Sequence, residues 1–246
     1  MSDFNTFRRK LYVAVLGWLG RDTVNFAPHG VPVTIPAGID PAIRYLLVRG
    51  RPYEAPEAEM VRRYLKPGTP VIELGGCVGV ISALIRDQIG PDARHIVVEA
   101  SPELAPVCEA NATRGVKPGR TEVVTAAIDY SGAPTVSFST GRTAHAGHVE
   151  AAGKGQITVP ALRLSDLAGR LPDGPFALVS DIEGAELAMF AQDTAVLQRI
   201  DLLILETHPR DYPQHDADLT RMLAQITQAG LHQVAQMKNV FCYRRD

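Results

Sequence analysis

The chain has 246 residues, with 25 lysines and arginines against 27 aspartates and glutamates, so its formal net charge is −2. A chain of this length can bury a sizeable core without disulfides or a structural metal, and its three cysteines, which lack CxxC spacing, indicate neither. The near balance of charge, without a run of five like charges, argues against nucleic acid as a partner, and the cysteine pattern fits a cytoplasmic protein.

The first twenty residues contain a basic start and an apolar run, FRRKLYVAVLGWLG. The run is too short to span a bilayer, and no small-residue cleavage site of a signal peptide follows it. Helical spacing places Phe7, Leu11, Val15 and Trp18 near one face. We predict an amphipathic helix that packs on the domain or on a partner subunit of a homo-oligomer. Contact with a membrane surface is the alternative.

Residues 24–66 combine short apolar stretches with one helical pattern. VPVTIPAG and RYLLVRG are predicted to be short strands, and EAEMVRRYL is predicted to be a helix that ends at Lys66-Pro67-Gly68. We assign residues 1–66 to an N-terminal extension of helix and short strands, which packs on the core. Residues 67–246 form the predicted main domain.

Four later segments have the composition of buried parallel strands: VIEL (71–74), HIVVEA (95–100), FALVSDI (176–182) and DLLILETH (201–208). TEVVTAAI is predicted to be another strand of the first half. Helical patterns lie between them, in residues 82–88, SPELAPVCEANATR, GAELAMFAQDTAVL and DADLTRMLAQITQAG, which ends at Gly230. This alternation predicts an α/β fold with a mostly parallel, doubly wound sheet.

Two segments depart from the alternation. TVSFST (135–140) and QITVPALRL (156–164) are predicted to pair antiparallel around a loop, and VAQMKNVFCYRR is predicted to be a hairpin with Asn239 near its turn. His145 and His148 have the spacing of metal ligands, but in this glycine-containing loop we expect them to be solvated. The loop is also a candidate lid over the acceptor.

The stretch VIELGGCVGVISALI forms a glycine-rich turn after the first strand of the sheet, where open parallel sheets bind ligands. It contains neither the GxGxxG dinucleotide motif nor the GxxxxGK[ST] phosphate motif. Glu73, one residue inside the strand, disfavours a pyrophosphate and suits a positively charged ligand. Glu99, at the end of the next strand, can accept both ribose hydroxyls of an adenosine. These features predict S-adenosylmethionine; glycines that serve only close packing are the alternative.

Four segments, in order across residues 52–208, resemble the FkbM-type S-adenosylmethionine-dependent methyltransferases: PYEAPEAEMVRRYLKPGTPVIELGGCVGVIS, HIVVEASPELAPVCEANATRG, SDIEGAELAMF and LLILETHP. The resemblance implies the seven-stranded Rossmann-like class I methyltransferase sheet with an antiparallel C-terminal strand. The chain departs from the family at Glu73 and Gly75-Gly76-Cys77, where Asp and Gly-Ala-Asn are common. It also departs at Asp129-Tyr130, where Gly-Asp is usual.

The resemblance further implies that Tyr53 and Glu54 close over the cofactor, with ordinary packing of the extension as the alternative. The predicted cofactor-binding residues come from this segment, the glycine turn and the strand ends. They are Tyr53, Glu73, Gly75, Gly76, Cys77, Val78, Gly79, Glu99, Ala100, Ser101, Ala127, Ile128 and Asp181.

Four side chains that suit acid–base chemistry follow neighbouring strands. Asp181 and Glu183 follow one predicted strand, and Glu206 and His208 close the next, so all four are expected to converge beside the cofactor. A hydroxyl acceptor has to lose a proton, and His208 is the predicted general base, with capping of the strand end as the alternative. Asp181 and Glu206 are alternatively the ligands of a divalent cation. Glu183 and Glu186 alternatively place negative charge at the start of the next helix.

The predicted function is transfer of a methyl group from S-adenosylmethionine to a hydroxyl of a sugar, glycolipid or secondary metabolite. A nucleic-acid or protein methyltransferase is one alternative, although DIEG stands where nucleic-acid enzymes have [DN]-P-P-[FY]. A non-catalytic binding or scaffold protein is another, favoured by the unusual turn GGCVG. The expected partner is a small-molecule or glycan acceptor.

Overall fold

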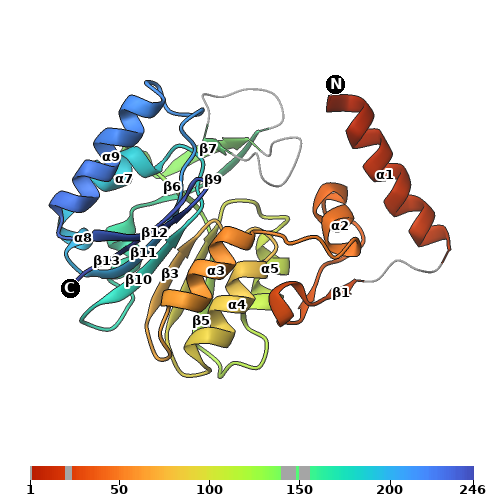
Figure 1. The fold of residues 1–246 in the computed structure, drawn as a ribbon, viewed down its shortest axis with the longest axis horizontal. Coiled ribbons are helices and arrows are strands. Elements are labelled where there is room, and N and C mark those ends of the chain that lie inside the picture. Colours follow the sequence, from red (N-terminus) through yellow and green to blue (C-terminus); the bar gives the residue numbers. More distant parts are fainter. Residues whose placement is uncertain (1, 20–23, 140–147, 150–155) are drawn as a thin grey trace.

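The computed structural model describes residues 2–19, 24–139, 148–149 and 156–246 (Figure 1). Its centre is a seven-stranded sheet in the order β12-β13-β11-β10-β3-β4-β5. The strands are β3 (Val71–Leu74), β4 (His95–Glu99), β5 (Thr121–Thr125), β10 (Phe176–Ser180), β11 (Ile200–Glu206), β12 (His232–Met237) and β13 (Val240–Arg244). Strand β13 runs antiparallel to β11 and β12, and the other neighbours are parallel. The predicted α/β fold and mostly parallel seven-stranded sheet are confirmed.

Helices cover both faces of this sheet (Figure 1). They are α3 (Ala55–Tyr64), α4 (Val80–Ile89), α5 (Ala105–Ala112), α6 (Leu164–Ala168), α7 (Glu186–Gln192), α8 (Thr194–Leu197) and α9 (Asp216–Gln228). Because successive strand residues point to opposite faces, Val71 packs with Val61 and Ile85 of α3 and α4, whereas Ile72 packs with Phe190 of α7. The sheet is therefore buried on both faces, as its continuous apolar strands predict.

The strand register aligns the carboxyl ends of the central strands. Leu74 of β3 lies beside Ser180 of β10, and Ser180 lies beside Leu205 of β11. The residues that follow, Asp181 and Glu206 among them, therefore share one edge of the sheet with the glycine-rich turn.

A smaller sheet in the order β6-β9-β7-β8 lies next to the main one. Its strands are β6 (Ala127–Ile128), β7 (Thr135–Ser139), β8 (His148–Val149) and β9 (Gln156–Leu162). The predicted antiparallel pairing of β7 with β9 is confirmed. TEVVTAAI, predicted as one strand, divides between β5 and β6 in different sheets. His145 and the side chain of His148 lie outside the described residues, so their predicted solvation stays a prediction.

The N-terminal segment forms α1 (Ser2–Trp18), β1 (Asn25–Phe26), the short helix η1 (Pro28–Gly30), β2 (Val33–Thr34) and α2 (Pro41–Val48). The predicted strand RYLLVRG is wrong, because most of it belongs to α2. The Asp40 side chain accepts a hydrogen bond from the Ala42 N–H at 2.6 Å, and Pro41 occupies the first turn. This cap and proline start a helix whose Ile43 and Leu47 are buried.

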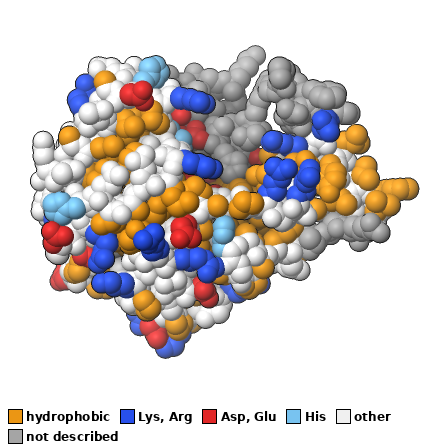
Figure 2. All heavy atoms as spheres, in the orientation of Figure 1, with side chains coloured by type: hydrophobic (Ala, Val, Ile, Leu, Met, Phe, Trp, Pro, Cys, Tyr) orange, Lys and Arg blue, Asp and Glu red, His pale blue; other side chains and the backbone are white. Residues whose placement is uncertain are grey.

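Helix α1 is confirmed as a helix and contacts α2, where the rings of Tyr12 and Tyr45 lie 5.4 Å apart. Its apolar side chains remain largely exposed: Leu11 by 52%, Val15 by 45% and Trp18 by 87%. Figure 2 shows such hydrophobic side chains at the far right of the molecule, over this part of the chain. Among the described residues, no helix has the length and apolar character needed to cross a membrane.

The segment GAELAMFAQDTAVL, predicted as one helix, is divided into α7 and α8 at Asp193. The Asp193 carboxylate accepts hydrogen bonds from the Tyr130 hydroxyl at 2.5 Å and from the Ser165 N–H at 3.0 Å. The Tyr130 hydroxyl in turn accepts from the Leu164 N–H at 3.1 Å. One buried carboxylate thus ties α6 and the segment after β6 to the break between α7 and α8.

Candidate active site

A glycine-rich turn joins β3 to α4 at the carboxyl edge of the sheet. The N–H groups of Gly75 and Gly76 both donate to the Val98 carbonyl, at 2.9 and 3.1 Å, and so fasten the turn to β4. Gly75 has φ +89°, and a Cβ at this position would lie 2.0 Å from the carbonyl oxygen of Asp181. Only glycine permits this approach, which brings the turn directly against the end of β10.

The other two glycines of the turn make room for α5. A Cβ on Gly76 would lie 2.5 Å from Cγ1 of Val97 and 2.7 Å from Sγ of Cys108. Gly79 has φ +78°, and its Cβ would lie 2.9 Å from the Cys108 carbonyl oxygen. Close packing, the alternative explanation for the glycines, therefore accounts for these two positions.

Glu73 points into the protein rather than toward the turn. Its carboxylate accepts a hydrogen bond from the Ser82 hydroxyl at 2.8 Å, and its other oxygen lies 2.9 Å from Nε2 of His95. Burial lowers the pKa of His95 although Glu73 opposes this shift, so the neutral ring donates to the carboxylate. Because both Glu73 oxygens are satisfied by α4 and β4, the predicted role of Glu73 beside a positively charged ligand does not fit this geometry.

Glu99, in contrast, is held at the edge of the sheet by two backbone groups. Its oxygens accept from the Cys77 N–H at 2.6 Å and the Ser101 N–H at 2.7 Å. Burial raises the pKa of Glu99 to about 7, although both N–H groups favour the charged form. A carboxylate has about four acceptor positions, so two remain for a ligand.

Cys77, which departs from the family pattern, has a conformational role. Its φ of +47° is unusual for a residue other than glycine, and this conformation accompanies the N–H bond to Glu99. The Tyr53 hydroxyl lies 3.6 Å from its Sγ, and Nε2 of His29 lies 2.5 Å from the Tyr53 carbonyl oxygen. Burial raises the pKa of both Tyr53 and Cys77, so both are neutral. Tyr53 therefore reaches the turn from the N-terminal segment, but its side chain is buried in a core that includes Val78, so its closure over a cofactor stays a prediction.

The remaining predicted cofactor-binding residues have their side chains in three separate apolar clusters. Ala127 belongs to a small apolar cluster that Ala100 packs against, and Glu99 and Ser101 flank Ala100 in the chain. The side chains of Ile128 and Val78 are buried in two other cores. Only their backbone groups are available to a ligand, whereas Ala100 and Ala127 can supply an apolar wall.

Three polar side chains meet at the ends of β10 and β11. Nε2 of His208 lies 3.4 Å from Oδ1 of Asp181 and 3.9 Å from Oε1 of Glu206. One ligand atom from each of the three lies within 4.8 Å of the others. Glu183 is half-buried nearby, and its charge contributes to raising the pKa of Asp181, for which burial is the larger cause. The predicted convergence of strand-end side chains is therefore present, with Glu183 outside the group of three.

Glu186 and Tyr212 hold His208 from the other side. Oε1 of Glu186, which is fully buried, lies 3.2 Å from Nδ1 of His208 and accepts from the Tyr212 hydroxyl at 3.3 Å. The backbone N–H of His208 donates to the same Tyr212 hydroxyl at 3.2 Å. Glu186 was expected only to place charge at the start of α7, but it also orients the imidazole.

Two residues that the sequence did not indicate support Glu206. The Asn239 side chain, from the turn between β12 and β13, donates to Oε1 of Glu206 at 2.7 Å. Glu57 of α3 is buried, and burial together with its hydrogen bond to Glu206 raises its pKa strongly. Burial and the charge of Asp181 likewise raise the pKa of Glu54. The site is therefore rich in carboxyl groups contributed by distant parts of the chain.

The protonation of His208 differs from the predicted one. Burial disfavours the charged ring, but the hydrogen bond to Glu186 and the charges of Asp181 and Glu206 outweigh this and raise the pKa of His208 to about 9. A ring with this pKa already carries a proton at neutral pH. The general-base role predicted for His208 does not fit these surroundings.

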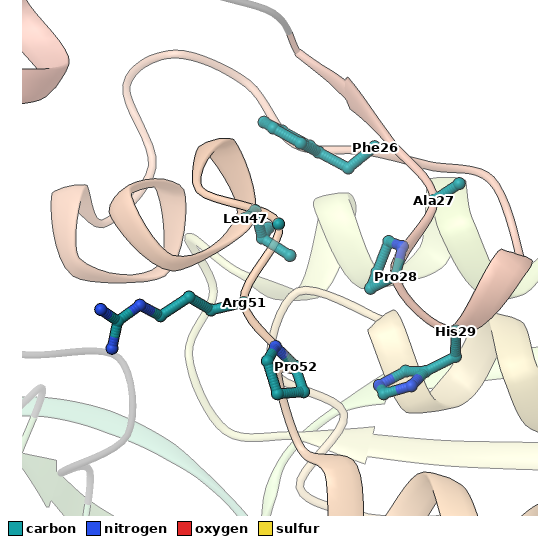
Figure 3. Close-up of a pocket in the computed structure, with 8 residues that line it drawn as sticks. Phe26, Ala27, Pro28, His29, Leu47, Arg51 and Pro52 are labelled. Atoms are coloured by element: carbon teal, nitrogen blue, oxygen red, sulfur yellow. The ribbon is translucent and has the colours of Figure 1, made fainter.

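A pocket of about 350 Å³ lies apart from these residues, between β1, η1 and α2 (Figure 3). Its lining residues are Phe26, Ala27, Pro28, His29, Leu47, Gly50, Arg51 and Pro52. None of the predicted site residues lines this pocket. The strand ends therefore remain the candidate active site.

Comparisons with known proteins show the family to which the chain belongs. A model of the methyltransferase FkbM domain matches residues 74–231, more than half of the chain. No match is found among curated proteins.

Solved structures similar to the chain include three methyltransferase-fold proteins of low identity. Fibrillarin of Aeropyrum pernix, with bound S-adenosyl-L-methionine, is 13% identical with a TM-score of 0.43, over 76% of this chain and 72% of that one. Ribosomal protein L11 methylase of Lactobacillus delbrueckii subsp. bulgaricus is 15% identical with a TM-score of 0.43, over 77% and 78%. Precorrin-6y C5,15-methyltransferase of Geobacter metallireducens is 12% identical with a TM-score of 0.43, over 77% and 86%.

Proposed function

The chain belongs to the methyltransferase FkbM family, and from this membership we propose that it transfers a methyl group from S-adenosylmethionine to a hydroxyl of a sugar, glycolipid or secondary metabolite. The observation that carries the proposal is the juxtaposition of two groups of residues at one edge of the sheet. Glu99 and the glycine turn lie on one side, and Asp181, Glu206 and His208 lie on the other.

The first group fits the adenosine part of the cofactor. Glu99 is fixed by the N–H groups of Cys77 and Ser101 and retains acceptor positions for two ribose hydroxyls. Ala100 and Ala127 offer an apolar surface for the adenine. When bound, S-adenosylmethionine supplies a methyl group that its positive sulfonium activates. The carboxylates around Asp181 favour a positive charge at this place.

The second group suits an acceptor that has to lose a proton. A hydroxyl placed between β10 and β11 would meet the carboxylates of Asp181 and Glu206, which can accept its hydrogen bond and its proton. His208 lies between them and limits their mutual repulsion. The aligned ends of β10 and β11 hold these groups rigidly, and such alignment of reactants is worth several kcal/mol in methyl transfer (roughly 7–11 at most).

Calorimetric titration of the purified chain tests the cofactor. We expect S-adenosylmethionine and its demethylated product to bind with micromolar dissociation constants, and nicotinamide dinucleotides not to bind. A screen of glycans and small hydroxyl compounds with labelled methyl donor then tests the reaction. Binding of nicotinamide cofactor in place of S-adenosylmethionine would contradict the proposal. Cofactor binding without transfer to any compound favours the scaffold alternative.

Cofactor binding is expected to weaken as the pH falls through 7. Glu99 has a pKa of about 7, and only its charged form can accept hydrogen bonds from both ribose hydroxyls while keeping its two backbone bonds. Those bonds lower its pKa in the complex, so binding releases a proton at low pH. By linkage, the dissociation constant should rise about tenfold from pH 8 to pH 6. Calorimetry across this range measures the change.

Glu99→Gln is the matched control for this prediction. Glutamine keeps the size of the side chain but does not titrate, so binding should be weaker at pH 8 and should lose the share of the pH dependence that Glu99 contributes. Asp181, whose pKa burial and Glu206 raise to about 7, contributes the share that remains. If the wild-type dissociation constant for S-adenosylmethionine does not change between pH 6 and pH 8, Glu99 does not bind the ribose.

A further inference from the structure

We propose that Asp181, Glu206 and His208 bind a divalent cation at the ends of β10 and β11. Binding of the ion by these three side chains does not depend on which reaction the protein catalyses. Its purpose, to acidify the acceptor hydroxyl as metal ions acidify bound water, rests on the proposed function.

The spacing of the three ligand atoms suits one ion. Nε2 of His208 lies 3.4 Å from the Asp181 oxygen and 3.9 Å from the Glu206 oxygen, and the three atoms lie within 4.8 Å of one another. Two ligands that are each about 2.2 Å from an ion lie about 3.1 Å apart at a right angle and about 4.4 Å apart when opposite. The two separations fall inside this range without movement of the backbone.

The orientation of His208 is a second and independent observation. A histidine that binds a metal usually directs its other ring nitrogen at a carboxylate, which fixes the ring. Here Nδ1 lies 3.2 Å from Oε1 of Glu186, so Nε2 is left facing Asp181 and Glu206. Glu186 is fully buried, and its Oε2 has no hydrogen-bond partner among the described residues. A buried carboxylate with an unpaired oxygen is costly, and a histidine that merely capped the strand end would not require one beside it.

Glu206 is supported in the same way. The Asn239 side chain donates to its Oε1 at 2.7 Å, and buried Glu57 bonds to its carboxylate from α3. Ligating carboxylates are commonly held by such neighbours. Glu206 at the end of β11 and His208 just after it are therefore both oriented by side chains from other elements.

The negative charge around His208 favours a cation with more than the single positive charge of an imidazolium. Three carboxylates, those of Asp181, Glu186 and Glu206, lie within 4 Å of the single ring of His208. One positive charge balances only part of theirs, and partly buried charges are costly unless they are paired. A divalent ion provides the missing charge at the point where the three ligands meet. It replaces the proton on Nε2 of His208, which is released to solvent, while Nδ1 keeps its proton toward Glu186.

The donor set indicates the kind of ion. Two carboxylates and one imidazole suit Mn²⁺ and related first-row ions, since carboxylate oxygens suit Mg²⁺ and Mn²⁺ and imidazole suits Zn²⁺ and Fe²⁺. Mn²⁺ is the probe of choice because free Mn²⁺ has an electron paramagnetic resonance signal that weakens on binding.

The test is a Mn²⁺ titration of the chelator-treated full chain, without cofactor or acceptor. We expect one ion to bind per chain, with a rise in melting temperature. Asp181→Asn and His208→Ala should each weaken binding by at least tenfold. Glu186→Ala should weaken it about tenfold, because the ligand loses its orienting partner. His232→Ala, which removes an exposed histidine that pairs with Asp246, should bind Mn²⁺ as the wild type does.

Two outcomes overturn the proposal. One is the absence of binding at millimolar Mn²⁺ or Mg²⁺, and the other is binding that survives in both Asp181→Asn and His208→Ala. Retention of folding is checked for each variant by its melting temperature without metal. Mn²⁺ binding by a chain that methylates no acceptor would leave the metal site intact and count against the proposed function. If methyl transfer proceeds at the full rate with excess chelator, the proposed function stands but the ion takes no part in the reaction.

Discussion

His208→Ala is expected to lower methyl transfer by a factor of about 10 to 100 while S-adenosylmethionine still binds. The imidazole lies between the oxygens of Asp181 and Glu206, at 3.4 and 3.9 Å. Its removal leaves these carboxylates to repel each other and, if the cation binds as proposed, removes one ligand. The cofactor-facing residues around Glu99 belong to other strands and are not altered.

Two measurements check this expectation. Transfer of labelled methyl to an acceptor found in the screen gives the rate, and calorimetry gives the affinity for the cofactor. His232→Ala is the control for loss of a histidine elsewhere on the chain and should keep the wild-type rate. Asp181→Ala should also abolish transfer. If both His208→Ala and Asp181→Ala turn over as the wild type does, the reaction takes place elsewhere.

Gly75→Ala is expected to lower the free energy of unfolding by about 3–5 kcal/mol. The alanine would adopt a left-handed backbone, at a cost of about 1–2 kcal/mol, because φ at this position is +89°. Its Cβ would also lie 2.0 Å from the Asp181 carbonyl oxygen. Separating two central strands to admit it should cost about 2–3 kcal/mol more. Denaturant unfolding measures the loss.

Gly132→Ala separates the two contributions. Gly132 has nearly the same φ, +85°, but a Cβ there would have no neighbour within 4 Å. It should therefore lose only the backbone part, about 1–2 kcal/mol. If both variants unfold at the same denaturant concentration, the contact between Gly75 and Asp181 has no energetic consequence.

The parallel strands of the main sheet could be predicted from the sequence because their apolar runs are short and local. VIEL coincides with β3, FALVSDI contains β10, and DLLILETH covers β11 except for Ile200. RYLLVRG was misassigned because its branched and apolar residues suit either structure. The signal that decides for a helix, Asp40 followed by Pro41, is present just before it.

The candidate site was predictable where it follows strand ends. Glu99, Asp181, Glu206 and His208 are found there because a parallel sheet gathers its carboxyl ends at one edge. Glu57 and Asn239 were missed, because only the tertiary packing of α3 and of the terminal hairpin brings them to Glu206. The proton on His208 was missed for the same reason, since three separate carboxylates determine it.

Under the proposed function, the close approach of Gly75 to Asp181 also bears on how new acceptor preferences arise. The glycine turn and the first residue after β10 touch through backbone alone, so no side chain between them can be exchanged to reshape the centre. We expect relatives to diversify instead at the periphery, in the β6–β9 sheet and in the segment from α2 to Tyr53.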